Sequence, residues 1–533
     1  MKDASTVSLA GWLREPRADA GLHFLEDDDT WRYVSYEDLA GRVAALAEVL
    51  RDEGLAGRRL GLVGETSENL VVQALATLAT GGTCVPIPSY QPGQNRAAHD
   101  RLVGAVLQSA RPFRVLGVDG SEALSGWEAA TVPDWRALSP RPGVQVSPSD
   151  APAIIQFTSA STGVPKGVRQ SHRSLEVCLT GMQQRARYSR EDRWVSWLPP
   201  WMLWTVLTPM AHGVDLMLMT PRQFADRPER WLRCVGEHGA TITLAASFGY
   251  HLVATTVPRQ ALEGLRFDRW RIALIFGEPL RAVDLDEFVA AFGPLGFERR
   301  AFCPTYGMTE APVITTTAPE ELPVALAERV EGPGARSGVA TGAALHAAGP
   351  GDRMVGVGRP LPGVRVSIRL PGGSEAPDEE LGEVWVGGEI LGAGYDGGED
   401  FGEWLATGDV GCVRDGVLFL FGRLADSFQI RGTLYLAEQA EHALRAAVSG
   451  VDSLVVIPTR TEGAGVTVVV ESPEHWSTQR TDEVREIVSE LLQQTEVDVL
   501  VVPSGAIPRT DAGKPQRHEA WARYVSGAQE PPR

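Results

Sequence analysis

The sequence predicts an α/β protein built on a parallel β-sheet, and two observations carry this prediction. Residues 35–54 have the pattern of an amphipathic helix, with a serine N-cap, an acid three positions later and a regular apolar stripe. Short apolar runs at 60–63 and 83–87 flank a second helical pattern at 69–80. Strands that alternate with helices in this way form a parallel sheet with helices packed on its faces.

The same alternation continues along the chain. The sequence predicts helices at 90–111 (after a polar turn), 172–185 and 227–238, and strands at 151–155, 214–219, 241–244 and 271–276. Further strands are expected at 364–370, 382–386 and 417–421, and residues 319–352 have the Ala, Gly, Glu and Pro content of a variable, partly loop-like insertion. At 533 residues the chain is too long for one hydrophobic core, so several domains are expected.

Composition excludes several classes of function. The net charge of −18 argues against non-specific binding of nucleic acid and against adhesion to anionic membranes. The five cysteines are isolated, which suggests neither a zinc site nor a disulfide framework and fits a reduced cytosol. The amino terminus lacks the apolar region of a signal peptide, and no apolar run approaches 18 residues. A cytoplasmic protein without a membrane span is therefore expected.

The stretch from Gln156 to Val168 is the strongest local signal. It follows an apolar run and contains four hydroxyl side chains, two glycines, a proline and a lysine. Such a loop can direct backbone N–H groups and hydroxyls at phosphate oxygens, with Lys166 adding a point charge. Its spacing differs from the Walker form G-x-x-x-x-G-K-[ST]. Taken alone, the stretch is equally compatible with a surface turn rich in Ser, Thr and Gly.

Four motifs together resemble those of the adenylate-forming superfamily, which includes acyl-CoA synthetases, peptide-synthetase adenylation domains, luciferases and fatty acyl-AMP ligases. They are T-S-x-S-T-G-x-P-K-G at 158–167, Y-G-x-T-E at 306–310, T-G-D at 407–409 and P-x-T-x-x-G-K-x-x-R at 508–517. The resemblance covers most of the chain, and several stretches are most similar to fatty acyl-AMP ligases.

The resemblance implies a domain organisation. An N-terminal adenylation domain, residues 1–422, would comprise two doubly wound α/β subdomains plus a small β-rich subdomain at about 355–422. A small mobile α+β C-terminal domain, residues 423–533, would carry the catalytic lysine. Ala425 stands at the hinge position, where relatives have a polar residue.

The resemblance also implies ATP and Mg²⁺ as cofactors. Lys514, Thr309 and Glu310 would be catalytic: Lys514 would bridge the substrate carboxylate and the α-phosphate, Thr309 would touch that phosphate, and Glu310 would bind Mg²⁺. Tyr306 would lie against adenine, while Asp409 and Arg423 would hold the ribose. The nucleotide-binding residues implied are Thr158, Ser159, Ser161, Thr162, Gly163, Lys166, Gly277, Glu278, Pro279, Thr305, Tyr306, Gly307, Met308, Asp409, Phe421 and Arg423.

A tryptophan-rich segment bears on the acid substrate. Four Trp residues fall within 194–204, where relatives usually carry a His-Asp or similar polar pair after Leu-Pro. These rings can be ordinary core packing or the wall of an apolar acyl pocket. The pocket residues implied are Trp201, Trp204, Ala245, Ser247 and Phe248. A fatty acid or a bulky polycyclic acid would suit such a pocket.

The expected reaction is the attack of a carboxylate on the α-phosphate of ATP with loss of pyrophosphate, in lipid or secondary-metabolite biosynthesis. The acyl group would pass to an acyl carrier protein, to CoA or through a separate acyl-transferring partner. A complete acyl-CoA ligase is one alternative. A nucleotide-binding regulatory homologue is another, because Ala160 and Ala425 depart from the usual motif residues. A peptide-synthetase domain is disfavoured, since no Asp for an amino group lies at 245–248.

Overall fold

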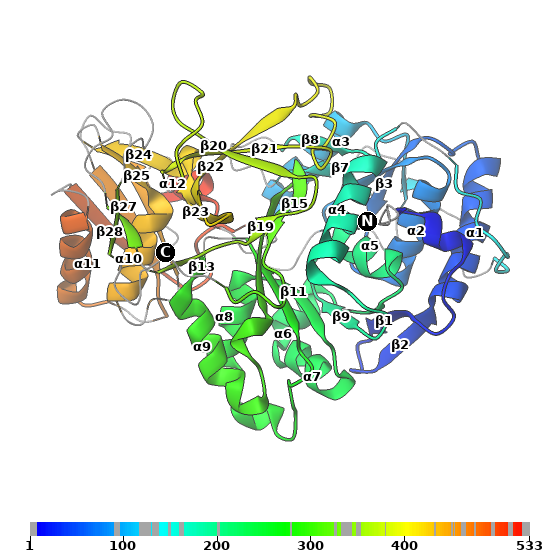
Figure 1. Cartoon of the computed structure of the whole chain (residues 1–533), viewed down its shortest axis with the longest axis horizontal. Coiled ribbons are helices and arrows are strands. Elements are labelled where there is room, and N and C mark those ends of the chain that lie inside the picture. Colours follow the sequence, from blue (N-terminus) through cyan, green and yellow to red (C-terminus); the bar gives the residue numbers. More distant parts are fainter. Residues whose placement is uncertain are drawn as a thin grey trace.

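The computed structural model describes residues 8–89, 96–116, 129–130, 138–147, 151–158, 165–199, 203–277, 280–323, 328–331, 344–347, 353–378, 380–430, 433–448, 451, 453–459, 465–473, 476–491, 496–509 and 515–524. The predicted α/β class is confirmed. Figure 1 shows the C-terminal elements, coloured orange to red, at one end of the long axis and the first helices at the other.

A six-stranded sheet forms the first layer, in the order β6-β5-β3-β4-β7-β8. Its neighbours pair in parallel except β7 and β8, which form an antiparallel hairpin. The strands are β3 (Arg59–Val63), β4 (Thr83–Ile87), β5 (Arg114–Leu116), β6 (Ala129–Ala130), β7 (Ile154–Phe157) and β8 (Gly167–Gln170); the helices are α1 (Tyr36–Asp52), α2 (Glu68–Ala79) and α3 (Arg96–Ala110). Ser35 caps α1 as predicted, by accepting from the Asp38 N–H.

A nine-stranded sheet follows, in the order β19-β15-β14-β12-β11-β9-β10-β1-β2. Its strands are β1 (Gly21–Leu25), β2 (Trp31–Ser35), β9 (Arg193–Ser196), β10 (Asp215–Leu218), β11 (Ile242–Ala246), β12 (Ile272–Phe276), β14 (Phe302–Met308), β15 (Ala311–Thr316) and β19 (Arg359–Pro360). The helices of this part are α4 (His172–Ala186), α5 (Leu203–Ala211), α6 (Pro221–Asp226), α7 (Glu229–His238), α8 (Ser247–Thr256) and α9 (Ala282–Phe292).

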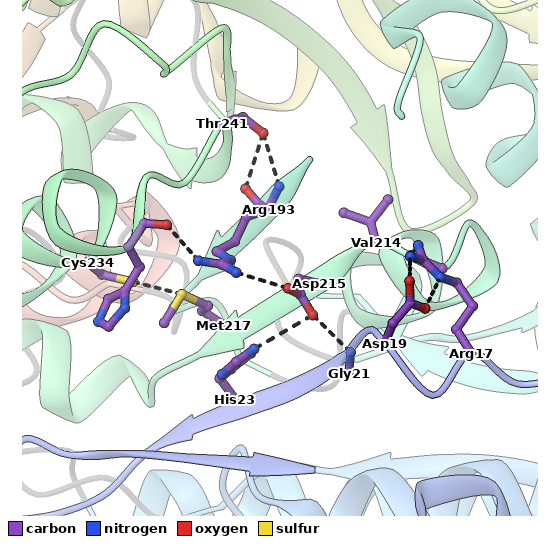
Figure 2. A network of polar contacts seen from close by, with 12 residues as sticks. Arg17, Asp19, Gly21, His23, Arg193, Val214, Asp215, Met217, Cys234 and Thr241 are labelled. Carbon is purple, nitrogen blue, oxygen red and sulfur yellow. Dashed lines mark hydrogen bonds and ion pairs between the residues drawn. The ribbon is translucent and has the colours of Figure 1, made fainter. Parts of the chain in front are cut away.

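A partly buried polar network attaches the N-terminal strand β1 to this sheet (Figure 2). The Asp215 carboxylate accepts from the Gly21 N–H at 2.9 Å and from Arg193 Nη2 at 3.1 Å, and His23 Nε2 lies 3.7 Å from it. Arg193 also donates to the His238 carbonyl at 2.7 Å. Asp215 and Arg193 begin their strands, so this network lies at the amino ends of β9 and β10.

Smaller sheets complete the chain. A four-stranded antiparallel sheet contains β20 (Arg365–Arg369), β21 (Gly382–Gly387), β22 (Trp404–Arg414) and β23 (Val417–Arg423). Two-stranded pairs are formed by β13 (Leu280–Arg281) with β18 (Met354–Val355), by β16 (Glu328–Glu331) with β17 (Ala344–Ala347), and by β24 (Ser427–Ile430) with β25 (Thr433–Leu436). The predicted insertion at 319–352 therefore contains a strand pair.

The C-terminal region has its own three-stranded sheet and its own core. β26 (Ser453–Thr459), β27 (Gly465–Glu471) and β28 (Glu496–Val502) pair in sequence order, with α10 (Ala437–Ala447), α11 (Thr478–Leu491) and α12 (Arg517–Tyr524). Alternate strand residues point to opposite faces. Leu454 and Val456 join the core with α10 and α11, whereas Val455 and Ile457 join the one with α12.

Two predicted boundaries are wrong for local reasons. The helix expected at 227–238 begins at Glu229, because a separate helix α6 precedes it and Arg227 has extended dihedral angles. Thr220 starts α6 with a capping box and a proline in the first turn. The strand expected at 151–155 begins at Ile154, since Pro152 lacks the N–H that a strand ladder needs. No helix in the described ranges has the length and apolar character to cross a bilayer.

Candidate active site

The β7–β8 hairpin brings the two ends of the predicted phosphate loop together. Phe157 pairs with Gly167, and beyond them the Thr158 N–H donates to the Lys166 carbonyl at 3.0 Å. The Lys166 N–H in turn donates to Thr158 Oγ1 at 3.2 Å. Lys166 is exposed, so its ammonium is available to an anion. The predicted residues Ser159, Ser161, Thr162 and Gly163, together with Ala160, lie outside the described residues.

Three predicted nucleotide residues from distant parts of the chain meet in one hydrogen-bonded cluster. The Tyr306 hydroxyl donates to Asp409 Oδ2 at 2.5 Å, and Arg423 Nε donates to Asp409 Oδ1 at 2.8 Å. Tyr306 lies on β14, while Asp409 and Arg423 are paired across β22 and β23. Asp409 is therefore a strand residue, held between a phenol and a guanidinium.

The electrostatics of this cluster favour the protonated forms of Tyr306 and Arg423. Burial, followed by the adjacent Asp409 carboxylate, raises the pKa of Tyr306 well above its usual value, so the phenol stays a donor. Asp409 also raises the pKa of Arg423. Both carboxylate oxygens of Asp409 still have lone pairs for further donors, such as sugar hydroxyls.

The turn after β14 carries Glu310. A side chain at Gly307 would place its Cβ 2.0 Å from the Pro312 carbonyl oxygen, so the tight approach of β14 and β15 requires glycine there. The Gln170 amide donates to the Thr309 carbonyl, and the Gly392 N–H donates to the Glu310 carbonyl at 2.8 Å. Glu310 is buried, and Met308 and Thr309 are partly exposed.

Sequence reasoning missed one residue at this point, Tyr395. Its hydroxyl donates to Glu310 Oε1 at 2.9 Å, and Lys166 Nζ lies 5.0 Å from its ring centroid. Tyr395 thus touches two predicted site residues that lie 144 positions apart in the sequence. A single tyrosine in an irregular segment carries no local pattern, so only the tertiary structure reveals it.

The donor set suits Mg²⁺. Among the described residues there is no group of three or more side chains able to hold a metal ion. Glu310, which accepts a hydrogen bond from Tyr395, is the carboxylate that the family resemblance predicts to bind Mg²⁺. Mg²⁺ usually takes one or two carboxylates and completes its coordination with waters and substrate phosphates. A single carboxylate beside a bound nucleotide therefore fits a Mg²⁺ site.

The remaining predicted nucleotide residues occupy varied positions. Gly277 follows β12 with φ of +118°, a conformation that favours glycine, and Glu278 and Pro279 lie outside the described residues. Thr305 is buried and its hydroxyl contacts Thr316 Oγ1 at 2.8 Å. Phe421 is fully buried in the core of the four-stranded sheet. Thr305 and Phe421 therefore have packing roles in this conformation, and their nucleotide roles remain predictions.

The predicted acid-binding residues border an aromatic core. Ala245 is fully buried near the end of β11, and Ser247 and Phe248 form the first turn of α8, where both are partly buried. Trp197 stacks on Phe224 with centroids 4.0 Å apart, and Phe248 meets it edge-on at 5.6 Å. Trp194, Trp197 and Trp204 are all buried, as the packing alternative requires. Trp201 lies outside the described residues.

Lys514 also lies outside the described residues, but both ends of its loop are held by ion pairs. Arg509 Nη2 lies 3.0 Å from Glu471 Oε2, and the Gln516 N–H donates to the Pro508 carbonyl at 2.7 Å. Arg517 bonds Glu441 Oε2 at 2.7 Å and Asp426 Oδ2 at 3.0 Å. Since Asp426 directly follows Ala425, the base of the Lys514 loop is tied to the predicted hinge.

Comparison with known proteins identifies the family and several relatives of the chain. The family model of AMP-binding enzymes matches residues 14–396. A long-chain-fatty-acid–AMP ligase of Mycolicibacterium smegmatis is 27% identical, over 94% of this chain and 90% of that protein. A medium-chain-fatty-acid–acyl-carrier-protein ligase of Moorena producens is 24% identical, over 93% and 90%. A solved structure from a study of fatty acyl-adenylate ligases of E. coli and L. pneumophila is 26% identical and covers 98% of both chains with a TM-score of 0.84.

Proposed function

Because the chain belongs to the AMP-binding enzyme family, we propose that it joins a hydrophobic carboxylic acid to AMP. An oxygen of the acid attacks the α-phosphorus of ATP, the bond to the bridging oxygen breaks, and pyrophosphate leaves. The product is a mixed anhydride of the acid and AMP. No protein nucleophile is needed, so the chain contributes positioning and stabilisation of the charge that develops on the phosphoryl oxygens.

The observation that carries the proposal is the cluster of Tyr306, Asp409 and Arg423. Residues from two of the motifs, together with Arg423, are spread over more than a hundred positions and share hydrogen bonds of 2.5 and 2.8 Å. A regulatory homologue that had lost its chemistry would have no need for the further cluster of Lys166, Tyr395 and Glu310. The two clusters suit a ribose at one and a polyphosphate at the other.

The proposed roles follow from these positions. Asp409 and Arg423 hold the ribose, and Tyr306 lies against adenine while its hydroxyl orients Asp409. Lys166 and the phosphate loop hold the β- and γ-phosphates. Glu310 is the protein ligand of Mg²⁺, which neutralises phosphate charge when it is bound. Lys514 approaches the α-phosphate from the C-terminal domain, which we take as residues 423–533.

The acid and the acceptor are the finer part of the proposal. We propose a fatty-acid-like or bulky lipid-like acid, supported by the aromatic surroundings of Phe248 and by the similarity to fatty-acid ligases. Transfer of the acyl group to a carrier protein is supported by the name of the Moorena producens relative. All five cysteines are buried and none forms a disulfide, which supports a cytoplasmic location.

Exchange of radiolabelled pyrophosphate into ATP tests the proposal. The assay is run with fatty acids of 6 to 18 carbons, with arylalkanoic acids and with polycyclic acids. We expect exchange with at least one hydrophobic acid and none with free amino acids. CoA and a holo acyl carrier protein are then added separately, and thioester formation identifies the acceptor.

Each result has a distinct meaning. Exchange followed by thioester on the carrier protein alone supports the full proposal. Thioester on CoA alone assigns the chain as an acyl-CoA ligase and overturns the carrier-protein part. ATP binding without exchange for any acid overturns the enzymatic proposal and favours a nucleotide-binding regulatory protein.

A further inference from the structure

Residues 392–396 form an irregular segment that lies along β8. The Ala393 N–H donates to the Arg169 carbonyl at 2.7 Å, and the Arg169 N–H donates to the Gly394 carbonyl at 2.9 Å. Tyr395 makes a bridge with Val168, and the Asp396 N–H donates to the Gly167 carbonyl at 2.7 Å. These bonds fix Tyr395 directly beside the strand that ends the phosphate loop.

A second anchor holds the same segment from the other side. Arg59, at the start of β3, makes two bonds of 2.9 Å to the Asp396 carboxylate, whose side chain is only 6% exposed. Bidentate pairs of this kind restrict orientation as well as distance. The segment is therefore held both by backbone pairing with β8 and by an ion pair to β3.

Tyr395 lies between two groups of opposite charge. Its hydroxyl donates to Glu310 Oε1 at 2.9 Å, and its ring centroid lies 5.0 Å from Lys166 Nζ. Lys166 and Glu310 both contact this tyrosine, and among the described residues no ion pair joins the two directly. Phe401 packs edge-on against the ring with centroids 4.9 Å apart, which restricts its rotation.

The chemistry of a phenol suits this position. The Tyr395 hydroxyl donates its proton to the hydrogen bond with Glu310 Oε1, and its oxygen adds no charge beside the carboxylate. A neutral ring attracts the lysine through its face without competing for the carboxylate. In a direct ion pair, Lys166 and Glu310 would neutralise each other. Glu310 would then be less available to Mg²⁺, and Lys166 less available to a phosphate group.

We propose that Tyr395 is a positioning residue of the nucleotide site, which orients the Glu310 carboxylate for Mg²⁺ and holds Lys166 apart from it. This inference rests on the proposed function. Tyr395 acts through its two neighbours, and its hydroxyl and its ring have separable tasks. The hydroxyl sets the metal affinity, and the ring sets the position of Lys166.

Tyr395→Phe tests the hydroxyl, since it keeps the ring, the Lys166 contact and the packing on Phe401. Groups that orient a metal ligand typically change metal affinity by 10- to 100-fold, so we expect the Mg²⁺ concentration for half-maximal exchange to rise about tenfold. The rate at saturating Mg²⁺ should stay within about twofold. Tyr33→Phe, at a half-exposed tyrosine far from the cluster, is the control and should leave both quantities unchanged.

A double-mutant cycle separates positioning from a general structural effect. In a Glu310→Gln background the Tyr395→Phe change should have little further effect on Mg²⁺ dependence, because the group through which Tyr395 acts has lost its charge. Additive effects in the cycle would overturn the inference. Arg59→Met provides a second variant that loosens the segment without altering Tyr395, and it should also raise the Mg²⁺ requirement.

A binding measurement keeps this test separate from the proposed function. Mn²⁺ binding in the presence of a non-hydrolysable ATP analogue is followed by electron paramagnetic resonance for wild type and Tyr395→Phe. Weaker Mn²⁺ binding by the variant supports the inference, even if wild type activates none of the acids tested. Mn²⁺ affinities within twofold of each other overturn it, even if wild type forms an acyl-adenylate.

Discussion

The proposed nucleotide site and the aromatic core beneath the predicted acid-binding residues differ in how their buried polar atoms are bonded. At the nucleotide side, Tyr306, Asp409 and Arg423 are bonded to one another across three strands. In the aromatic core, the indole nitrogens of Trp194, Trp197 and Trp231 are buried without a hydrogen-bond partner among the described residues. The first region is defined by directional bonds and the second by shape, so substitutions should affect ligand binding in one and stability in the other.

The largest effect is expected in the aromatic core. Trp231 is fully buried, and its ring centroid lies 5.2 Å from that of Tyr250 and 5.8 Å from that of Trp270. Trp231→Ala should lower the free energy of unfolding by about 3–5 kcal/mol, the usual cost of deleting a large buried aromatic. Chemical denaturation measures the loss, while ATP affinity of the folded protein should not change.

Trp404 provides the control for this prediction. It is only partly buried on the four-stranded sheet, where Arg365 and Arg369 lie over its ring. Trp404→Ala should cost clearly less stability than Trp231→Ala. Equal losses would mean that burial in the aromatic core is not what distinguishes the two regions.

Lys514→Ala should give the next largest effect, and on rate instead of stability. Removing one preorganised donor to the transition state lowers a rate by about 10²–10³, equivalent to roughly 3–4 kcal/mol. Pyrophosphate exchange measures the loss, and ATP binding should persist because the nucleotide cluster is untouched. Exchange close to the wild-type rate would remove Lys514 from the mechanism.

Asp409→Asn tests the nucleotide cluster directly. The substitution keeps the shape but removes the charge that bonds Arg423 and Tyr306. Hydrogen bonds to charged groups contribute about 1.5–3 kcal/mol, so ATP affinity should fall by about one to two orders of magnitude. Isothermal titration measures the affinity, with Asp400→Asn at an exposed pair as the control. An unchanged affinity would place the nucleotide elsewhere.

The smallest effect concerns the pH dependence of the C-terminal region. Glu438 lies 3.3 Å from Arg517 beside Glu441 and Asp426, and burial raises its pKa to about 8. The folded protein then binds more protons than the unfolded chain between about pH 4.5 and 8, so stability falls as pH rises through this window. Glu438→Gln imitates the protonated acid.

The measurement is the melting temperature at pH 5.5 and pH 8. The difference between the two should be smaller in Glu438→Gln than in wild type, and Glu486→Gln on an exposed face of α11 should behave as wild type. An identical pH difference in Glu438→Gln and wild type would show that Glu438 is ionised in the folded protein.

Local pattern was sufficient for the elements that carry their own signals. The Ser35 cap and apolar stripe identified α1, and the hydrophobic runs identified β3 and β4 to within one residue. Local pattern gave the wrong boundary where a neighbouring helix determined where the predicted helix begins. The split between α6 and α7 depends on a capping box and on the dihedral angles of Arg227, which the apolar periodicity does not reveal.

The site divided in the same way. The family resemblance predicted that Tyr306, Asp409 and Arg423 belong to one site, and the structure brings these three side chains together. Tyr395 was missed because its importance comes from contacts with Lys166 and Glu310, which lie far from it in the sequence. The Trp-rich segment left core packing and an acyl pocket both open, since the same apolar residues satisfy either requirement.

The sequence by itself determined the α/β class, the family and most of the residues proposed for the nucleotide site. It did so because turns, caps, hydrophobic periodicity and phosphate-binding loops are short-range features that a few adjacent residues specify. Only the tertiary structure decided that Tyr395 contacts both Lys166 and Glu310, and that Asp426, beside the predicted hinge, bonds Arg517. Those contacts join residues that are distant along the chain, and it is the packing of the sheets that brings them within bonding distance.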